Sequence, residues 1–144
     1  MKIEIEKDEI NELTVRIICK EVDENVKKLK YYIGLYDNNI LAKRKDEFVR
    51  IGIKDIYYIE SVDGRIFIYG EKEVYEIDYR LFELEEQLDK KDFYRSSKSQ
   101  IININHMKSI KPELNRTLTV TMKNNEKLSI SRRCSVGFRK MLGI

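Results

Sequence analysis

Between residues 51 and 130 the chain is a series of short segments, rich in Ile, Val and Tyr, that are separated by turn signals. Residues of these types favour strands, and short strands joined by close turns are typical of antiparallel sheets. Asp63-Gly64 is a strong signal for a two-residue hairpin turn. Asn124-Asn125 lies between two further strand-like segments and predicts a second hairpin. These patterns predict a β-dominated domain over residues 46–144.

Two helices are predicted within this domain. Leu81, Leu84 and Leu88 recur at the spacing of one helical face and predict a helix over residues 80–88. A second helix is predicted over residues 135–142, and it ends near a glycine that is a good stop signal. Two short helices are too few to cover a doubly wound α/β sheet. The fold class is therefore predicted to be mainly β.

The first 45 residues follow a different pattern. Residues 1–6 alternate Ile with charged residues and predict a strand, and residues 12–20 predict a second one. Residues 21–33 change to helical spacing, with acidic residues in the first turn. Cys19 ends an apolar run and is expected to be a buried small hydrophobic side chain. We therefore predict a small acidic β-β-α unit over residues 1–45.

Charge is distributed very unevenly along the chain. Residues 90–144 carry thirteen basic and three acidic side chains, a net charge of +10, whereas the whole chain carries +3. Residues 1–89 therefore carry −7. A basic region of this density is typical of a surface that binds a polyanion such as nucleic acid. A solvated face of Lys and Arg is the alternative, and charge alone does not decide between them.

The sequence contains none of the motifs that would indicate an enzyme. No HxxxH, CxxC or other Cys/His cluster could hold zinc, and Cys19 and Cys134 lie far apart. No glycine-rich phosphate loop and no GxSxG motif is found. His106, the one histidine, fits a structural or surface role better than that of a general base. We expect no catalytic residues, metal site, cofactor or small-molecule substrate.

Two further sequence signals bear on location. No apolar run approaches the length of about 18 residues that a membrane span needs. The N-terminus lacks the apolar core of a signal peptide. The protein is therefore expected to be cytoplasmic.

Two basic elements carry the chemistry of the C-terminal part. Residues 95–99, with the sequence RSSKS, form a bend between two strand-like segments, and their hydroxyl and basic groups suit phosphate oxygens or a guanine edge. Residues 131–133, with the sequence SRR, lie at the junction of the last hairpin and the final helix, where the helix N-terminus adds partial positive charge. SRR is also compatible with a helix cap whose arginines pair with acidic residues elsewhere. Chemistry alone leaves both interpretations open.

Five segments in order resemble one family: DIYYIES, VDGR, YRLFELEEQL, FYRSSKSQIININHMKSI and KLSISRR. The most specific patterns are F-x-R-x-x-x-S-x-I-[IV]-N, which begins at Phe93, and S-R-R. Residues 46–144 thus resemble the LytTR-type DNA-binding domain of bacterial transcription regulators. The resemblance implies small antiparallel sheets with two short helices. It also implies that loops, rather than a recognition helix, place side chains in successive major grooves of double-stranded DNA and bend the duplex.

The resemblance also implies which residues contact DNA. Three loops of the family read bases, and in this chain they match the turn Asp63-Gly64-Arg65, Lys98 and Arg132. In the short first loop the candidate is Arg65. Phosphate contacts are implied at Arg95, Ser97, Ser99 and Arg133. Because Lys98 cannot make the bidentate amide contact with adenine, the target sequence of relatives does not carry over.

The front of the chain differs from the best-known members of the family, which carry a receiver domain before this module. About 45 residues are too few for a receiver fold, so the chain resembles the short standalone LytTR regulators. Its N-terminal unit is interpreted as a homodimer interface, as a dock for a regulatory partner, or as packing only. Some standalone relatives are associated with a membrane protein. The alternative function is therefore an interaction module that sequesters or senses a protein partner and binds DNA weakly.

Overall fold

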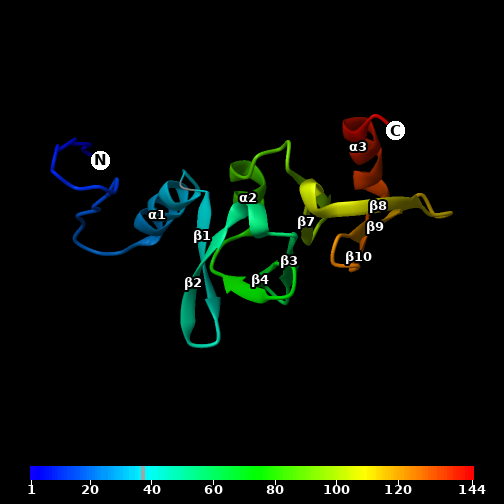
Figure 1. Cartoon of the computed structure of the whole chain (residues 1–144), viewed down its shortest axis with the longest axis horizontal. Helices are drawn as coiled ribbons and strands as arrows, with labels where there is room; N and C mark the ends of the chain where they lie inside the picture. Colours follow the sequence, from blue (N-terminus) through cyan, green and yellow to red (C-terminus); the bar gives the residue numbers. More distant parts are fainter. Residues whose placement is uncertain (37) are drawn as a thin grey trace.

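The computed structural model describes residues 1–36 and 38–144 as two antiparallel sheets with three α-helices (Figure 1). The larger sheet has the strand order β2-β1-β5-β4-β3-β7-β6. Its strands are β1 (Asn39–Arg44), β2 (Glu47–Gly52), β3 (Tyr58–Val62), β4 (Arg65–Tyr69), β5 (Val74–Ile77), β6 (Phe93–Ser97) and β7 (Gln100–Asn103). The smaller sheet, in the order β10-β9-β8, contains β8 (Met107–Pro112), β9 (Leu118–Met122) and β10 (Lys127–Ile130). The predicted mainly β fold class is confirmed.

The helices are α1 (Glu24–Tyr36), α2 (Leu81–Gln87) and α3 (Arg132–Leu142), with short 3-10 turns η1 (Ile53–Asp55) and η2 (Ile104–His106). Two hydrophobic cores result. One lies between the seven-stranded sheet and α1 and α2, where Ile59, Ile68 and Leu84 are fully buried. The other lies between the three-stranded sheet and α3, around Val120 and Phe138. Burial of such apolar side chains is the main force that holds each sheet to its helices.

Local signals in the C-terminal part are confirmed by the structure. Asp63 and Gly64 have φ of 51° and 76°, as a two-residue hairpin turn between β3 and β4 requires. All three leucines of the predicted helix over residues 80–88 are buried. The final helix ends at Gly143, which has φ of 73°. It begins at Arg132, three residues earlier than predicted, because the Ser131 side chain accepts a hydrogen bond from the Cys134 N–H and caps the helix.

The two strands predicted near the N-terminus are wrong. Residues 1–23 form no strand, and the helix begins at Glu24 instead of residue 21. Cys19, expected to be buried, is exposed. Two short strands are at best marginally stable unless a hydrophobic face packs on another element, and only α1 makes such a contact, through Tyr31.

The first sheet continues across the position that separates the two predicted domains. β1 pairs with β2 along its whole length, from Asn39 opposite Gly52 to Arg44 opposite Glu47. The turn between these strands contains residues 45 and 46. Residues on both sides of the predicted boundary therefore share one sheet and one core. In the part of the chain that the structure describes, no helix is long and apolar enough to cross a membrane.

Candidate nucleic-acid interface

Hydrogen bonds from the Arg95 side chain stabilise the bend between β6 and β7. Its Nε donates to the carbonyl oxygen of Ser97 at 2.7 Å, and one terminal nitrogen donates to the carbonyl oxygen of Lys98 at 2.5 Å. The other terminal nitrogen pairs with the Glu85 carboxylate on α2 at 2.7 Å. A planar guanidinium suits such a bridge because its donors point in fixed directions. Arg95 thus holds the shape of its own loop, and the phosphate contact expected of it stays a prediction.

This arrangement presents the rest of the loop to solvent. Lys98 and Ser99 are exposed, and Ser97 is half-buried. The Ser97 and Ser99 hydroxyls lie 3.4 Å apart, and the Ser99 N–H donates to the Ser97 hydroxyl at 3.2 Å. Among the residues that the structure describes, the Lys98 ammonium makes no ion pair. The tip of the loop therefore offers one positive charge beside two hydroxyl groups.

The second basic element is the N-terminus of α3. Arg132 and Arg133 are its first two residues, and both are exposed. The Tyr94 hydroxyl donates to the Cys134 carbonyl oxygen at 2.8 Å, which anchors the first turn of α3 on β6. Unpaired N–H groups and the helix dipole make such an N-terminus favourable for an anion.

Backbone hydrogen bonds join the two basic elements. The Ser131 N–H donates to the carbonyl oxygen of Ser96 at 2.9 Å, and Ser96 itself is fully buried. On the other side of the bend, the Ser61 N–H donates to the carbonyl oxygen of Ser99 at 2.8 Å. The bend thus sits between β3 and the start of α3. Lys98 on one side and Arg132 and Arg133 on the other are therefore carried on two segments that a backbone hydrogen bond joins.

Arg65 lies apart from this group. Its guanidinium makes two hydrogen bonds with the Glu76 carboxylate, at 2.8 Å and 2.6 Å, and stacks over Phe67 at 5.2 Å. These hydrogen bonds hold the pKa of Glu76 below its usual value. Glu76 is on β5, whereas Ser99 bonds to β3 on the opposite side of β4. The side chain of Arg65 is therefore directed away from the loop that carries Lys98.

The structure adds a loop that sequence analysis did not single out. In the turn between β8 and β9, the Asn115 carbonyl oxygen accepts from Arg132 Nε at 3.1 Å, and the Arg116 carbonyl oxygen accepts from the Ser135 hydroxyl at 3.0 Å. Arg116 is exposed and has φ of 68°. Its position beside α3 depends on the pairing of distant strands, so only its basic charge was visible in the sequence.

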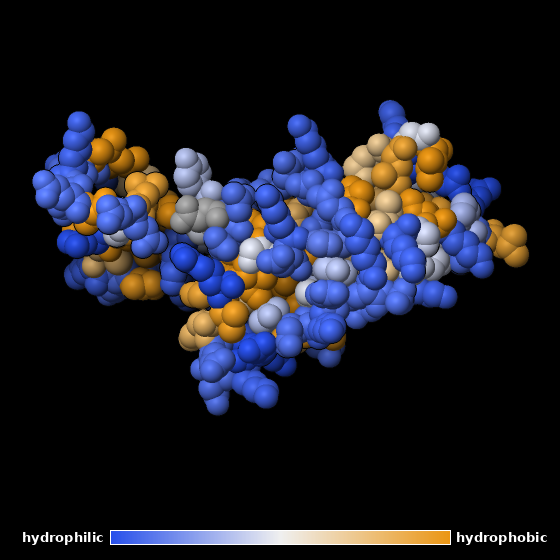
Figure 2. Space-filling view, viewed as in Figure 1, coloured by the Kyte–Doolittle hydropathy of each residue, from blue (hydrophilic) through white to orange (hydrophobic). Residues whose placement is uncertain are grey.

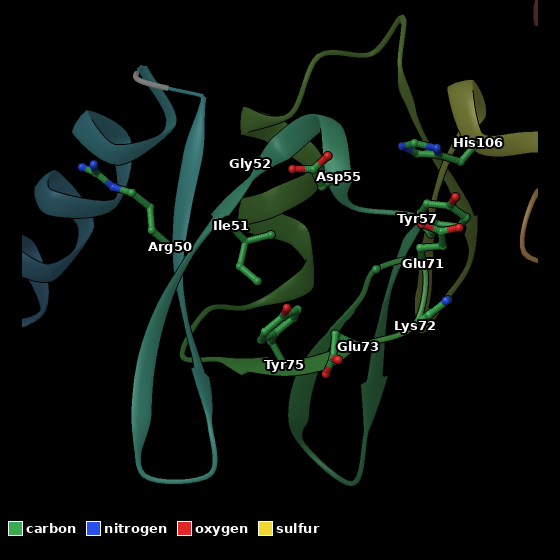
Figure 3. Close-up of a pocket in the computed structure, with 11 residues that line it drawn as sticks. Arg50, Ile51, Gly52, Asp55, Tyr57, Glu71, Lys72, Glu73, Tyr75 and His106 are labelled. Atoms are coloured by element: carbon green, nitrogen blue, oxygen red, sulfur yellow. The ribbon is translucent and has the colours of Figure 1, made fainter.

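A pocket with a volume of about 510 Å³ opens elsewhere, beside η1 and the β4–β5 connection (Figure 3). Its polar lining mixes acidic and basic side chains, such as Asp55, Glu71 and Lys72. His106 at its border stacks on Tyr57, with ring centroids 4.1 Å apart, and its Nε2 lies 2.5 Å from the Lys54 carbonyl oxygen. These contacts give His106 a structural role. Within residues 1–36 and 38–144, no group of three or more His, Cys, Asp or Glu could hold a metal ion.

Comparisons with known proteins agree with this geometry. Residues 46–143 match the model of the LytTr DNA-binding domain. A solved LytTr DNA-binding domain from Bacillus cereus has a TM-score of 0.72 and 30% identity, and the match covers 74% of this chain and 98% of that one. The sensory transduction protein LytT of Bacillus anthracis is 34% identical over 100 residues, which cover 69% of this chain and 41% of the relative.

A further relative is the transcriptional regulatory protein YpdB of Escherichia coli, which is 28% identical over 108 residues. That match covers 74% of this chain and 44% of the relative. This chain therefore spans less than half the length of either regulator. The matched region contains both basic elements and the strands that position them. The chain belongs to the LytTr DNA-binding domain family.

Proposed function

We propose that this protein is a sequence-specific DNA-binding transcriptional regulator. The observation that carries the proposal is the hydrogen bond between Ser96 and Ser131, which joins two basic loops into one surface within a LytTr fold. That surface combines exposed cationic side chains, hydroxyl groups and a helix N-terminus, which are the groups that contact phosphates and the acceptor edge of guanine. Bacterial DNA as the target would place the protein in the cytoplasm.

The contacts divide into two roles. Lys98 and Arg132 read bases in the major groove, because each is exposed at the tip of its element. Ser97, Ser99 and Arg133 lie beside them and contact phosphates, which fixes the register of the protein on the duplex. Arg95 contributes by holding the bend in shape. Arg65 contributes least to DNA binding among the predicted residues, because its guanidinium is already hydrogen-bonded to the Glu76 carboxylate.

Bending of the duplex is the second part of the proposal. Two basic elements that a backbone hydrogen bond joins can contact DNA over a longer distance when the duplex curves around them. The cost of the bend depends on the base sequence, so bending adds specificity at base pairs that no side chain touches. Paired direct-repeat half-sites would be occupied by a dimer or by two monomers that cooperate through the bend.

A second candidate function is an interaction module that binds a protein partner through residues 1–23. The favouring observation is that apolar side chains there, such as Ile3, Ile5 and Ile18, are 78–93% exposed. Capture of a partner that requires these residues and survives Arg132→Ala would support this reading. Loss of capture together with loss of DNA binding in Arg132→Ala would argue against it.

Salt dependence distinguishes the two functions. If the basic surface binds DNA, the affinity for duplex DNA should fall steeply between about 50 and 200 mM salt, because each neutralised phosphate releases counterions. Binding is measured by fluorescence anisotropy with the full chain, and Lys20→Ala in the N-terminal segment serves as the control. An affinity for DNA that is negligible at low salt, or insensitive to salt, would contradict the proposal.

A further inference from the structure

Residues 1–23 leave an unusual amount of apolar surface in water. Ile3 and Ile5 are 78% and 93% exposed, and Leu13, Ile18 and Val22 are also exposed. Figure 2 shows hydrophobic side chains, interspersed with charged ones, at the end of the molecule that carries the N-terminus. Exposed large apolar side chains in this number are a reason to look for a surface that covers them.

The pattern of the first six residues specifies what kind of structure could cover them. Ile3 and Ile5 alternate with Lys2, Glu4 and Glu6, so an extended conformation places the isoleucines on one face and the charges on the other. A single such segment cannot be stable as a strand, because it needs a hydrogen-bonding partner on its edge. Residues 1–6 therefore have the pattern of a strand but no partner within the described chain.

The seven-stranded sheet has an edge that could supply this partner. β2 ends the strand order, and no described strand pairs with its outer side. The Ile53 N–H bonds to the Asn38 carbonyl oxygen across the β1–β2 hairpin. Because backbone groups alternate in direction along an antiparallel pair, Val49 bonds inward in the same way, and the N–H and C=O groups of Phe48 and Arg50 point outward. Such an edge readily accepts an added strand.

The two faces of the edge match the two faces of the segment. Ile51 is buried and Val49 half-buried on the side of the core, whereas Phe48 and Arg50 are exposed on the other side. An added strand with this orientation would place Ile3 and Ile5 next to Val49 and Ile51, on the side of the sheet that faces the core. Its glutamates would then lie beside Arg50, on the exposed face of β2.

Charge favours the pairing itself, and position favours a second molecule as the source of the strand. Residues 1–13 carry five acidic and two basic side chains, whereas residues 39–52 carry four basic and two acidic ones. In Figure 1 the N-terminal segment lies beyond α1, at the opposite end of the long axis from α3. It extends away from its own sheet, and the basic loops at the other end stay uncovered.

We propose that residues 2–6 of one copy of this chain add as a strand to the outer edge of β2 in a second copy. When the exchange is reciprocal, it closes a two-fold dimer in which residues 2–6 of both copies are paired. Sedimentation equilibrium of the full chain should show a concentration-dependent dimer. Ile5→Lys should reduce it to a monomer, whereas Leu114→Lys, which places the same charge at another fully exposed apolar position, should leave it dimeric.

Two further measurements locate the contact. Glu4→Lys should weaken the dimer, and combining it with Arg50→Glu should restore it, because the charge pair is reversed rather than lost. In the dimer, the amide protons of Phe48 and Arg50 should exchange slowly with solvent, and Ile5→Lys should make them exchange rapidly. A protein that is monomeric at every concentration would overturn the proposal, as would a dimer that Ile5→Lys leaves intact. Slow exchange of these amides in a monomer would also overturn it, since the segment would then cover its own sheet.

Discussion

The Ser131 N–H donates to the Ser96 carbonyl oxygen at 2.9 Å, and this hydrogen bond joins the bend after β6 to the start of α3. Ser96 is fully buried, so the bond is shielded from water. Lys98 lies two residues after Ser96, and Arg132 directly follows Ser131. A displacement of either loop therefore moves both candidate base-reading side chains.

Arg95 is expected to act on the shape of its loop rather than on a phosphate. Arg95→Ala should lower the free energy of unfolding by about 1–3 kcal/mol, because two carbonyl oxygens and a carboxylate lose charged hydrogen bonds. Arg95→Ala should also weaken DNA binding. Arg95→Lys should weaken it nearly as much as Arg95→Ala does, since an ammonium cannot bridge all three oxygens. Denaturant unfolding and DNA titration check this, with Lys90→Ala as the control. Wild-type affinity in Arg95→Lys would show that only its charge matters.

Lys98 is expected to discriminate between base sequences. Lys98→Ala should cost about 1–3 kcal/mol on the preferred site and much less on unrelated DNA if the ammonium contacts a guanine edge. Titrations on both DNAs over a series of salt concentrations test this. An equal loss on both, with a smaller salt dependence, would make Lys98 a phosphate contact instead.

Arg65 is expected to matter less for DNA binding than Arg132. Its guanidinium is already paired with Glu76, so Arg65→Ala should leave most of the affinity intact. Glu76→Gln should release the guanidinium, and Glu73→Gln provides a control with the same change of charge. If Arg65→Ala weakens binding as much as Arg132→Ala does, the pairing with Glu76 does not persist on DNA.

Gly137 keeps α3 close to β6. A Cβ atom at this position would lie 2.6 Å from the Tyr94 hydroxyl oxygen, which is too close for either atom. Gly137→Ala should therefore lower the free energy of unfolding by about 1–3 kcal/mol. It should also weaken DNA binding, because the start of α3 moves. Adding Tyr94→Phe removes the clashing oxygen and should recover part of the loss; a double variant less stable than either single one would refute this explanation.

Stability is expected to fall at alkaline pH. Burial raises the pKa of Tyr31 and Tyr58 well above the usual value near 10. Above about pH 10 the unfolded chain releases these protons while the folded protein keeps them, so rising pH favours unfolding. Denaturant unfolding at several pH values should show the fall.

The Tyr31→Phe variant tests the cause. Stability should then fall less at alkaline pH than in the wild-type protein. The substitution itself should cost little stability, since the Tyr31 hydroxyl has no hydrogen-bond partner among the described residues. Tyr36→Phe changes a tyrosine of the same helix that is 79% exposed and should leave the fall unchanged. A flat stability curve above pH 10 would contradict the role of these buried tyrosines.

Local signals in the sequence were sufficient for much of the fold. The Asp63-Gly64 turn, the leucines of α2 and the glycine after α3 were all predicted, because each depends on neighbours a few residues away. The N-terminal strands were predicted from the same kind of alternation and were wrong. Alternation shows that a segment can form a strand, but the strand exists only when another strand pairs with it.

The candidate site shows the same limit. The family resemblance indicated Arg65 and Arg95 as DNA contacts, but the sequence did not reveal that they pair with Glu76 and Glu85 in the folded protein. These partners lie eleven and ten residues away and come close only after the sheet and α2 have formed. Periodicity identifies which face a residue occupies, but it does not reveal which acidic side chain reaches a given cation.

The most direct test of sequence-specific DNA binding is selection from fragmented genomic DNA with the purified full chain, carried out in parallel with Arg132→Ala. The Arg132 side chain is exposed at the start of α3, so its loss should remove a base contact without unfolding the protein. We predict that the wild-type protein enriches a motif of two spaced repeats and that Arg132→Ala does not. Failure of the wild-type protein to enrich any motif, or enrichment of the same motif by the variant, would contradict the account.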